Sequence, residues 1–129
     1  MKKILVIEDE EDFQHLIGQI LEGKGFTVMY AGDGKEGLEM VKTALPDLLV
    51  LDINLPKING LEVLKRIRNS SAEAIKNLPI IMLTVRRKDE DQIKGLEIGA
   101  DDYITKPFKP AEFISRISAV LKRGQKSKN

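Results

Sequence analysis

Charged and oxygen-bearing side chains follow four of the short apolar runs in this chain, at the point where each run ends. Glu8 and Asp9 follow the first run, Asp52 the third and Thr84 the fourth, while Lys106 follows a weaker last run. If a fold gathers these residues, the three carboxylates repel one another unless a cation or a proton compensates their charge. Oxygen ligands at this density suit a hard divalent ion such as Mg²⁺. The residue types therefore predict a magnesium site beside a hydroxyl and an ammonium.

The apolar runs that precede these residues have the character of buried strands. They lie at residues 4–7, 26–30, 48–51 and 80–83, with a weaker run at 103–105. The first, third and fourth runs are continuously apolar, a pattern typical of strands that are buried on both faces of a parallel sheet.

The segments between the runs have the spacing of amphipathic helices. Gly23 is expected to end the first helix, Asp33 with Glu36 predicts a capping box at the start of the second, and Pro110 suits the first turn of the fifth. The stretch 69–77 is the one long connection that we expect. The apolar positions that mark the five helices are Phe13, Leu16, Ile17, Ile20 and Leu21; Leu38, Val41 and Leu45; Leu61, Leu64 and Ile67; Ile93 and Leu96; and Phe113, Ile114, Ile117, Val120 and Leu121.

Five strands that alternate with five helices predict an α/β domain, because right-handed crossovers place helices on both faces of an open parallel sheet. Ligands of such sheets bind outside the carboxyl ends of the strands, so the residues that follow the runs are expected to converge on one edge. Helix capping is the simpler interpretation of Glu10, Glu11 and Asp12. Capping explains Asp52 less well, because the next helical stripe after Asp52 begins only at Leu61.

Composition and charge narrow the class of protein. The 129 residues allow one domain of ordinary size. The 21 basic and 20 acidic residues leave a net charge of +1, which argues against a dedicated nucleic-acid or membrane-surface binder. The absence of cysteine excludes disulfides and thiolate chemistry. We expect a cytoplasmic domain, because the N-terminus is too acidic for a signal peptide and no apolar run reaches membrane-spanning length.

The last residues differ from the rest of the chain. From residue 122 they read KRGQKSKN, a polar stretch with basic residues and no acid. We therefore expect a domain at residues 1–122, followed at residues 123–129 by a frayed polar basic tail or the start of a linker. Without the tail, the body of the chain has an excess of acids, and five consecutive acids occupy residues 8–12 beside the predicted metal site.

Four segments of the chain resemble the receiver domain of two-component response regulators. They are VIEDEED at the end of the first run, LLVLDINLPKING around Asp52, IIMLT ending at Thr84, and GADDYITKPF around Lys106. Their order and spacing match that family over roughly residues 2–122. The resemblance implies a flavodoxin-like (βα)5 fold, a doubly wound parallel sheet of five strands in the order 2-1-3-4-5.

The resemblance also implies a metal site. Asp52 is similar to the phosphoacceptor of the family, and Glu8 and Asp9 to the acidic pair that holds Mg²⁺. Asp9, Asp52 and the backbone carbonyl of Asn54 would be direct ligands, and Glu8 would act through water.

Three further residues would handle the phosphoryl group and the switch. Thr84 resembles the hydroxyl that hydrogen-bonds the phosphoryl group, Lys106 the cation that pairs with it, and Tyr103 the switch aromatic. The bond between Lys106 and Pro107 falls where the family has a cis peptide.

The implied function is that of a signalling switch. A histidine kinase or phosphotransfer protein would donate a phosphoryl group to Asp52. The added charge would shift the face of the fourth helix, fifth strand and fifth helix, which would control a partner or an attached output domain. The domain would not be an enzyme beyond its own phosphorylation and dephosphorylation. It would contact neither nucleic acid nor membrane, and it would be a monomer or a phosphorylation-dependent homodimer.

Several positions depart from the family pattern or tune it. Val85 stands where receivers usually carry a small residue, which predicts slower phosphoryl turnover than in a Val85→Ala variant. Asn54 and Arg86 occupy positions that tune dephosphorylation in the family.

The C-terminal third also resembles receivers that are attached to winged-helix DNA-binding domains and dimerise through ion pairs. Asp101, Glu112 and Arg116 fit that pattern, whereas Gln92 and Ser118 stand where it has basic residues.

Two other functions compete with the switch. A phosphatase of the haloacid dehalogenase type also uses a strand-terminal Asp and Mg²⁺, but it needs a second Asp where this chain has Asn54. A receiver that binds partners without phosphorylation is disfavoured, because all five site residues are present. Nucleotide binding is excluded on the sequence, since no Walker loop or GxGxxG turn follows the first run.

Overall fold

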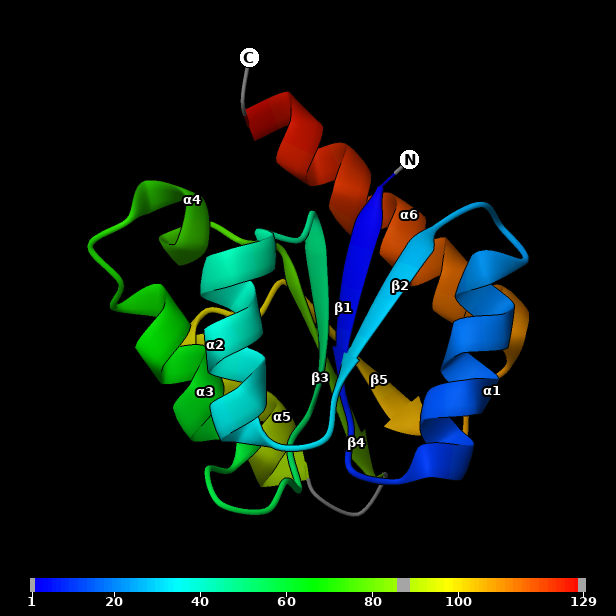
Figure 1. The fold of residues 1–129 in the computed structure, drawn as a ribbon, viewed down its shortest axis with the longest axis horizontal. Coiled ribbons are helices and arrows are strands. Elements are labelled where there is room, and N and C mark those ends of the chain that lie inside the picture. Colours follow the sequence, from blue (N-terminus) through cyan, green and yellow to red (C-terminus); the bar gives the residue numbers. More distant parts are fainter. Residues whose placement is uncertain (1, 86–88, 128–129) are drawn as a thin grey trace.

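Five parallel strands form one sheet in the order β2-β1-β3-β4-β5 in the computed structural model, which describes residues 2–85 and 89–127 (Figure 1). The strands are β1 (Lys3–Ile7), β2 (Thr27–Ala31), β3 (Leu48–Asp52), β4 (Ile80–Val85) and β5 (Asp102–Lys106). Every neighbouring pair is parallel. The α/β class, the strand order and the approximate position of each strand are therefore confirmed.

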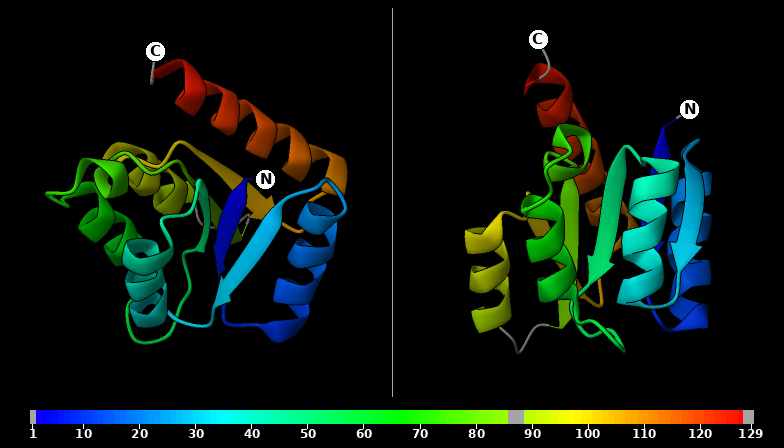
Figure 2. Two further views of the ribbon diagram at one scale, coloured as in Figure 1. Left: turned by 45° about the horizontal axis from the view of Figure 1, so that its top comes forward. Right: turned by 60° about the vertical axis from the view of Figure 1, so that its left-hand side comes forward.

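The helices lie on both faces of this sheet. They are α1 (Glu11–Glu22), α2 (Gly34–Ala44), α3 (Gly60–Arg68), α4 (Glu73–Lys76), α5 (Asp89–Ile98) and α6 (Pro110–Ser127). α1 and α6 cover one face, and α2, α3 and α5 cover the other (Figures 1 and 2). Five of them match the predicted helices, and α4 is a single turn inside the connection 69–77. No helix of the described part of the chain is both long and apolar enough to cross a lipid bilayer.

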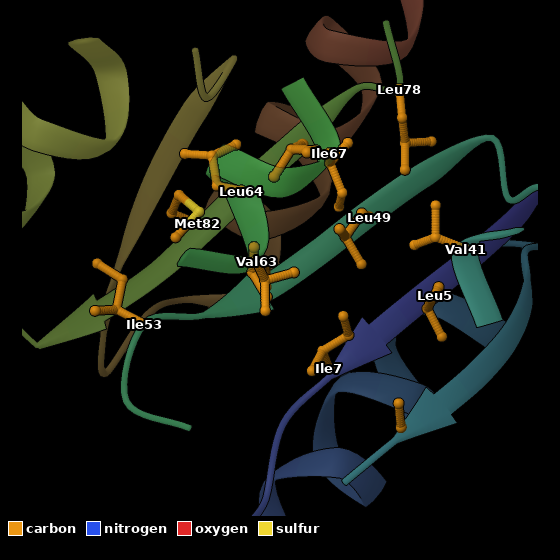
Figure 3. Close-up of a cluster of buried hydrophobic side chains, with 13 residues drawn as sticks. Leu5, Ile7, Val41, Leu49, Ile53, Val63, Leu64, Ile67, Leu78 and Met82 are labelled. Atoms are coloured by element: carbon orange, nitrogen blue, oxygen red, sulfur yellow. The ribbon is translucent and has the colours of Figure 1, made fainter. Parts of the chain in front are cut away.

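Two layers of apolar side chains explain why the strands read as continuous apolar runs. Successive residues of a strand point to opposite faces of the sheet. Leu5, Leu49 and Met82 point to the face under α2 and α3, where they pack with residues such as Val63 and Ile67 (Figure 3). The alternate strand residues pack on the other face with α1 and α6, in a cluster that includes Ile4, Val6, Ile17, Leu21, Leu48, Val50, Ile81, Leu83, Phe113 and Ile117.

Local sequence signals set several helix ends. The carboxylate of Asp33 accepts a hydrogen bond from the Glu36 amide (2.8 Å), as a capping box requires. The Glu36 side chain in turn accepts from the amide of Gly32 (3.0 Å). α1 ends before Gly23, and Gly25 then turns the chain towards β2 with a φ of +89°, a conformation that side chains disfavour.

The prediction for the apolar face of α5 is wrong. Ile93 and Leu96, which marked this helix in the sequence, are 58% and 45% exposed. Gly95 is buried close to Leu61 and Met82, and Ile98 packs against the same cluster. A glycine lets the helix approach its neighbours closely and leaves no apolar signal in the sequence.

The last helix is longer than its apolar stripe, because α6 continues to Ser127 and residues 123–127 are helical. Extending an existing helix needs no new nucleus. Lysine, arginine and glutamine are good helix formers, and one glycine costs only about 1 kcal/mol relative to alanine. The domain boundary at residue 122 stays a prediction, as does the polar basic tail or linker at residues 123–129. Arg86 lies outside the described residues, as does the side chain of Gln92.

Candidate functional site

The carboxyl ends of β1 and β3 bring the predicted acids together. Glu8 and Asp9 directly follow β1, and Asp52 is the last residue of β3, the strand that pairs with β1. One carboxylate oxygen from each of these residues lies within 4.8 Å of the others. Glu8 and Asp52 are buried, at 0% and 4% exposure, whereas Asp9 is exposed. The predicted convergence of the acids is therefore present.

Lys106 reaches this acidic group from the end of β5. Its ammonium donates hydrogen bonds to Glu8 Oε1 (2.7 Å) and to Asp52 Oδ2 (2.9 Å). The side chain is 15% exposed, so both ion pairs form largely out of solvent. One ammonium thus bridges the two buried carboxylates of the site.

The ionisation of the site reflects burial and the excess of acids. Burial, together with the nearby charge of Asp52, raises the pKa of Glu8 to about 7, although the hydrogen bond from Lys106 acts to lower it. Burial acts to lower the pKa of Lys106, but its hydrogen bonds to Glu8 and Asp52 outweigh burial, and the pKa is raised. Three acids face one ammonium, and this balance favours a second cation.

The donor set fits a divalent cation of the hard class. Two buried carboxylates and one exposed carboxylate supply the oxygen ligands that Mg²⁺ prefers, and exposure at Asp9 leaves room for the waters that this ion retains. Asn54 lies two residues after Asp52, and its backbone amide donates a hydrogen bond to Asp52 Oδ1 (3.1 Å). A ligand role for the Asn54 carbonyl stays a prediction.

Thr84 and Tyr103 lie near the site without joining the Lys106 network. Thr84 lies on β4 one residue beyond Leu83, the register partner of Asp52, and it is 1% exposed. Its hydroxyl donates to the carbonyl of Val85 (3.3 Å). Tyr103 is half-buried on β5 and packs against the cluster that contains Met82. Their roles as switch residues are not tested by this arrangement.

The residues that fit the ion-pair pattern of the dimeric receivers form ion pairs within this chain. Asp101 accepts from Arg68 (3.1 Å) and from the amide of Ile80 (2.8 Å). Arg116 donates to both carboxylate oxygens of Asp102 (3.0 and 3.1 Å) and also lies 3.8 Å from Glu112.

An aromatic residue of the α1 stripe contacts the site. The Lys106 ammonium lies 4.4 Å from the centroid of the Phe13 ring. Phe13 belongs to the apolar stripe of α1, so its position predicted packing alone. The histidine near it, His15, is exposed, as expected of a surface residue.

Comparison with known sequences identifies close relatives. The profile of the response regulator receiver domain matches residues 4–118. The chain is 46% identical over 124 residues to the alkaline phosphatase synthesis transcriptional regulatory protein PhoP of Bacillus subtilis, covering 96% of this chain and 50% of that protein. It is 42% identical over 123 residues to the transcriptional regulatory protein CpxR of Escherichia coli, covering 95% and 50%. The chain thus spans about half the length of these relatives.

Solved structures show the same architecture. The Francisella response regulator 1452 receiver domain superposes with a TM-score of 0.85 at 35% identity, covering 95% of this chain and 98% of that one. The chemotaxis response regulator CheY4 of Vibrio cholerae also has a TM-score of 0.85, at 30% identity and with coverage of 93% and 98%.

Proposed function

The chain belongs to the response regulator receiver domains, and we propose on this basis that Asp52 accepts a phosphoryl group from a histidine kinase or phosphotransfer protein. The observation that carries the proposal is the environment of Asp52. It is a buried carboxylate at a strand end, 2.9 Å from the Lys106 ammonium and grouped with two further acids. A small domain with few groups suffices, because phosphoryl transfer depends mainly on positioning and charge stabilisation.

The proposed chemistry divides the charge among the residues of the site. An oxygen of Asp52 attacks phosphorus, and the bond between phosphorus and the donor histidine nitrogen breaks. Lys106 offsets the negative charge of the incoming phosphoryl oxygens. Mg²⁺, held by Glu8, Asp9 and Asp52, would offset the remaining charge on those oxygens.

Phosphorylation would then bias the surface of the domain. The new phosphoryl oxygens compete with Glu8 for Lys106 and with the Val85 carbonyl for the Thr84 hydroxyl, which are the partners of these groups in this structure. Movement of Thr84 would make room for Tyr103 to turn inward, which changes the face formed by α5, β5 and α6.

We place the domain in a cytoplasmic two-component pathway. The curated relatives that it matches are transcriptional regulators about twice as long. The receiver at residues 1–122 would therefore control a partner or an attached output domain and would not itself contact nucleic acid or membrane. It would act as a monomer or as a phosphorylation-dependent homodimer, and it would catalyse at most its own phosphorylation and dephosphorylation.

A phosphatase of the haloacid dehalogenase type remains the competing function. Its general acid would have to stand at Asn54, whose amide side chain does not serve as a carboxylic acid does. The position therefore disfavours multiple turnover of external phosphoesters.

Phosphorylation from a small donor tests the proposal. The chain is incubated with acetyl phosphate and Mg²⁺, and covalent phosphate is measured by intact-protein mass spectrometry. We expect one phosphoryl group, abolished in Asp52→Asn and retained in Asp12→Asn, which removes an exposed acid of α1 outside the site. An unmodified wild-type chain would refute the switch, and turnover of diverse phosphoesters would favour the phosphatase.

A further inference from the structure

The Lys106 ammonium has three attractive neighbours, and one of them is not a hydrogen-bond acceptor. Glu8 and Asp52 accept two of its N–H bonds at 2.7 and 2.9 Å. The third neighbour is the face of the Phe13 ring, with the nitrogen 4.4 Å from its centroid. A cation within about 6 Å of a ring face is attracted by the ring quadrupole.

The Phe13 ring is held in place by a chain of aromatic contacts. It meets Phe108 edge to face, with centroids 5.7 Å apart and planes at 82°. Phe108 stacks on Phe113 at 4.8 Å and 18°, and Phe113 is fully buried in the core. These rings come from α1, from the connection after β5 and from α6. The surface that faces Lys106 is therefore fixed by tertiary packing.

We propose that Phe13 is a positioning residue for Lys106 in the phosphoryl transfer proposed above. A lysine ammonium has three N–H donors, and two of them are engaged by the carboxylates. The ring attracts the ammonium as a whole and occupies none of its donors in a conventional hydrogen bond. A phosphoryl oxygen can therefore accept from the third donor or from the donor that Glu8 engages in this structure. The ammonium keeps an attractive neighbour while its carboxylate partners change.

Simple packing is the alternative to this positioning role. Phe13 lies at the border of the cluster beneath α1 and α6, so replacement by a smaller residue would disturb both packing and charge. Fluorination separates the two effects, because it withdraws electron density from the ring face and changes the shape of the ring little. The experiment therefore places phenylalanine with one, two or three ring fluorines at position 13 of the full chain.

The first measurement is the rate of phosphorylation by acetyl phosphate with Mg²⁺ at subsaturating donor. We expect the rate to fall stepwise with each fluorine, by roughly three- to tenfold in total. A fold-change of this size corresponds to the free energy of a cation–π attraction. The matched control is the same series at Phe26, which borders the same cluster and has no cation–π partner among the residues that the structure describes. Rates at Phe26 should stay constant.

The second measurement does not depend on phosphorylation. The free energy of unfolding in urea, without divalent ions, is compared for Phe13 and its trifluoro form in wild-type and Lys106→Met backgrounds, as a double-mutant cycle. Fluorination should shift the unfolding equilibrium in the wild type and leave it unchanged once the ammonium is absent.

The outcomes separate the two proposals. If the chain is phosphorylated and the rate is the same for every fluorinated variant at position 13, the positioning role is overturned and the proposed function still stands. Equal effects of fluorination with and without the Lys106 ammonium would assign Phe13 to packing alone. A wild-type chain that acetyl phosphate does not modify would overturn the proposed function, and the role of Phe13 with it.

Discussion

Two partly buried cations lie at opposite ends of the sheet, and their surroundings differ. Lys106 lies at the carboxyl ends of the strands. Arg68 lies at the amino ends, where α3 ends close to α4 (upper part of Figure 1). The Arg68 guanidinium donates to the carbonyls of Gly99 (2.8 Å), Lys76 (2.9 Å) and Leu78 (2.7 Å) and to the Asp101 carboxylate (3.1 Å).

The surroundings of Arg68 and Lys106 differ in their balance of charge and in how many hydrogen-bond donors are engaged. Arg68 meets one carboxylate and several neutral carbonyls, so its rigid fork is satisfied and charge is balanced. Burial lowers its pKa from the usual value while Asp101 opposes that effect, and a guanidinium stays charged regardless. Lys106 meets two buried carboxylates, with a third acid beside them. The amino end thus stabilises one arrangement, whereas the carboxyl end has an excess of negative charge that a ligand can relieve.

Breaking the Arg68 cluster should have the largest effect on stability. Arg68→Ala removes the side-chain donor from three carbonyls, two of them part-buried, and leaves Asp101 with the Ile80 amide as its donor. We expect a loss of about 3 kcal/mol in the free energy of unfolding. Urea denaturation measures it. The control is Arg66→Ala, which removes an exposed pair with Glu62 and should cost less than about 1 kcal/mol. A loss of similar size in both variants would contradict a structural role specific to Arg68.

Adding Mg²⁺ should stabilise the carboxyl end. A ligand that binds only the folded state at one hundred times its dissociation constant adds about 2.7 kcal/mol. We therefore expect the thermal midpoint of unfolding to rise with Mg²⁺ and to return after chelation. Asp9→Asn should weaken this response and Asp12→Asn should preserve it. A midpoint that is indifferent to Mg²⁺ in the wild type would show that the acids bind no such ion.

Replacing Asp by Asn should change the free energy of unfolding in opposite directions at the two ends of the sheet. In the absence of divalent ions, Asp52→Asn relieves repulsion from Glu8 and should stabilise the fold by about 1 kcal/mol, as substitutions at functional sites often do. Asp101→Asn removes the charge that balances Arg68 and should destabilise the fold. Chemical denaturation of both variants checks the signs, and destabilisation by Asp52→Asn would mean that its bonds to Lys106 and Asn54 outweigh the repulsion.

Replacing Val85 should have the smallest effect of these changes, and the effect should be on phosphoryl turnover. It ends β4, pairs in register with Lys106 and is 37% exposed. This position lies at the carboxyl edge of the sheet, and Val85→Ala should speed phosphoryl turnover by about threefold, which corresponds to less than 1 kcal/mol of barrier. The test follows the decay of phosphorylated protein after removal of the donor. Equal lifetimes in the two proteins would remove Val85 from the determinants of turnover.

The strands, and the acids at their carboxyl ends, could be predicted from local patterns in the sequence. Runs such as 48–51 are apolar at every position because both faces of the sheet are covered, and this signal is local. A residue that directly follows such a run, as Glu8 does, or ends the strand, as Asp52 does, lies at the carboxyl edge by topology alone. The edge could therefore be predicted without any knowledge of how the helices pack.

The side chains that contact the two cations could not be predicted, because these contacts depend on the packing of distant elements. Phe13 carries the same apolar signal as Ile17, yet Phe13 faces Lys106 and Ile17 is buried core. Arg68 looks like any basic residue in the last turn of a helix. The contacts of both residues depend on how α1, α3 and the connections around β5 pack together. Sequence periodicity reports which face of an element is apolar, but it does not report which residues from distant elements that face will meet.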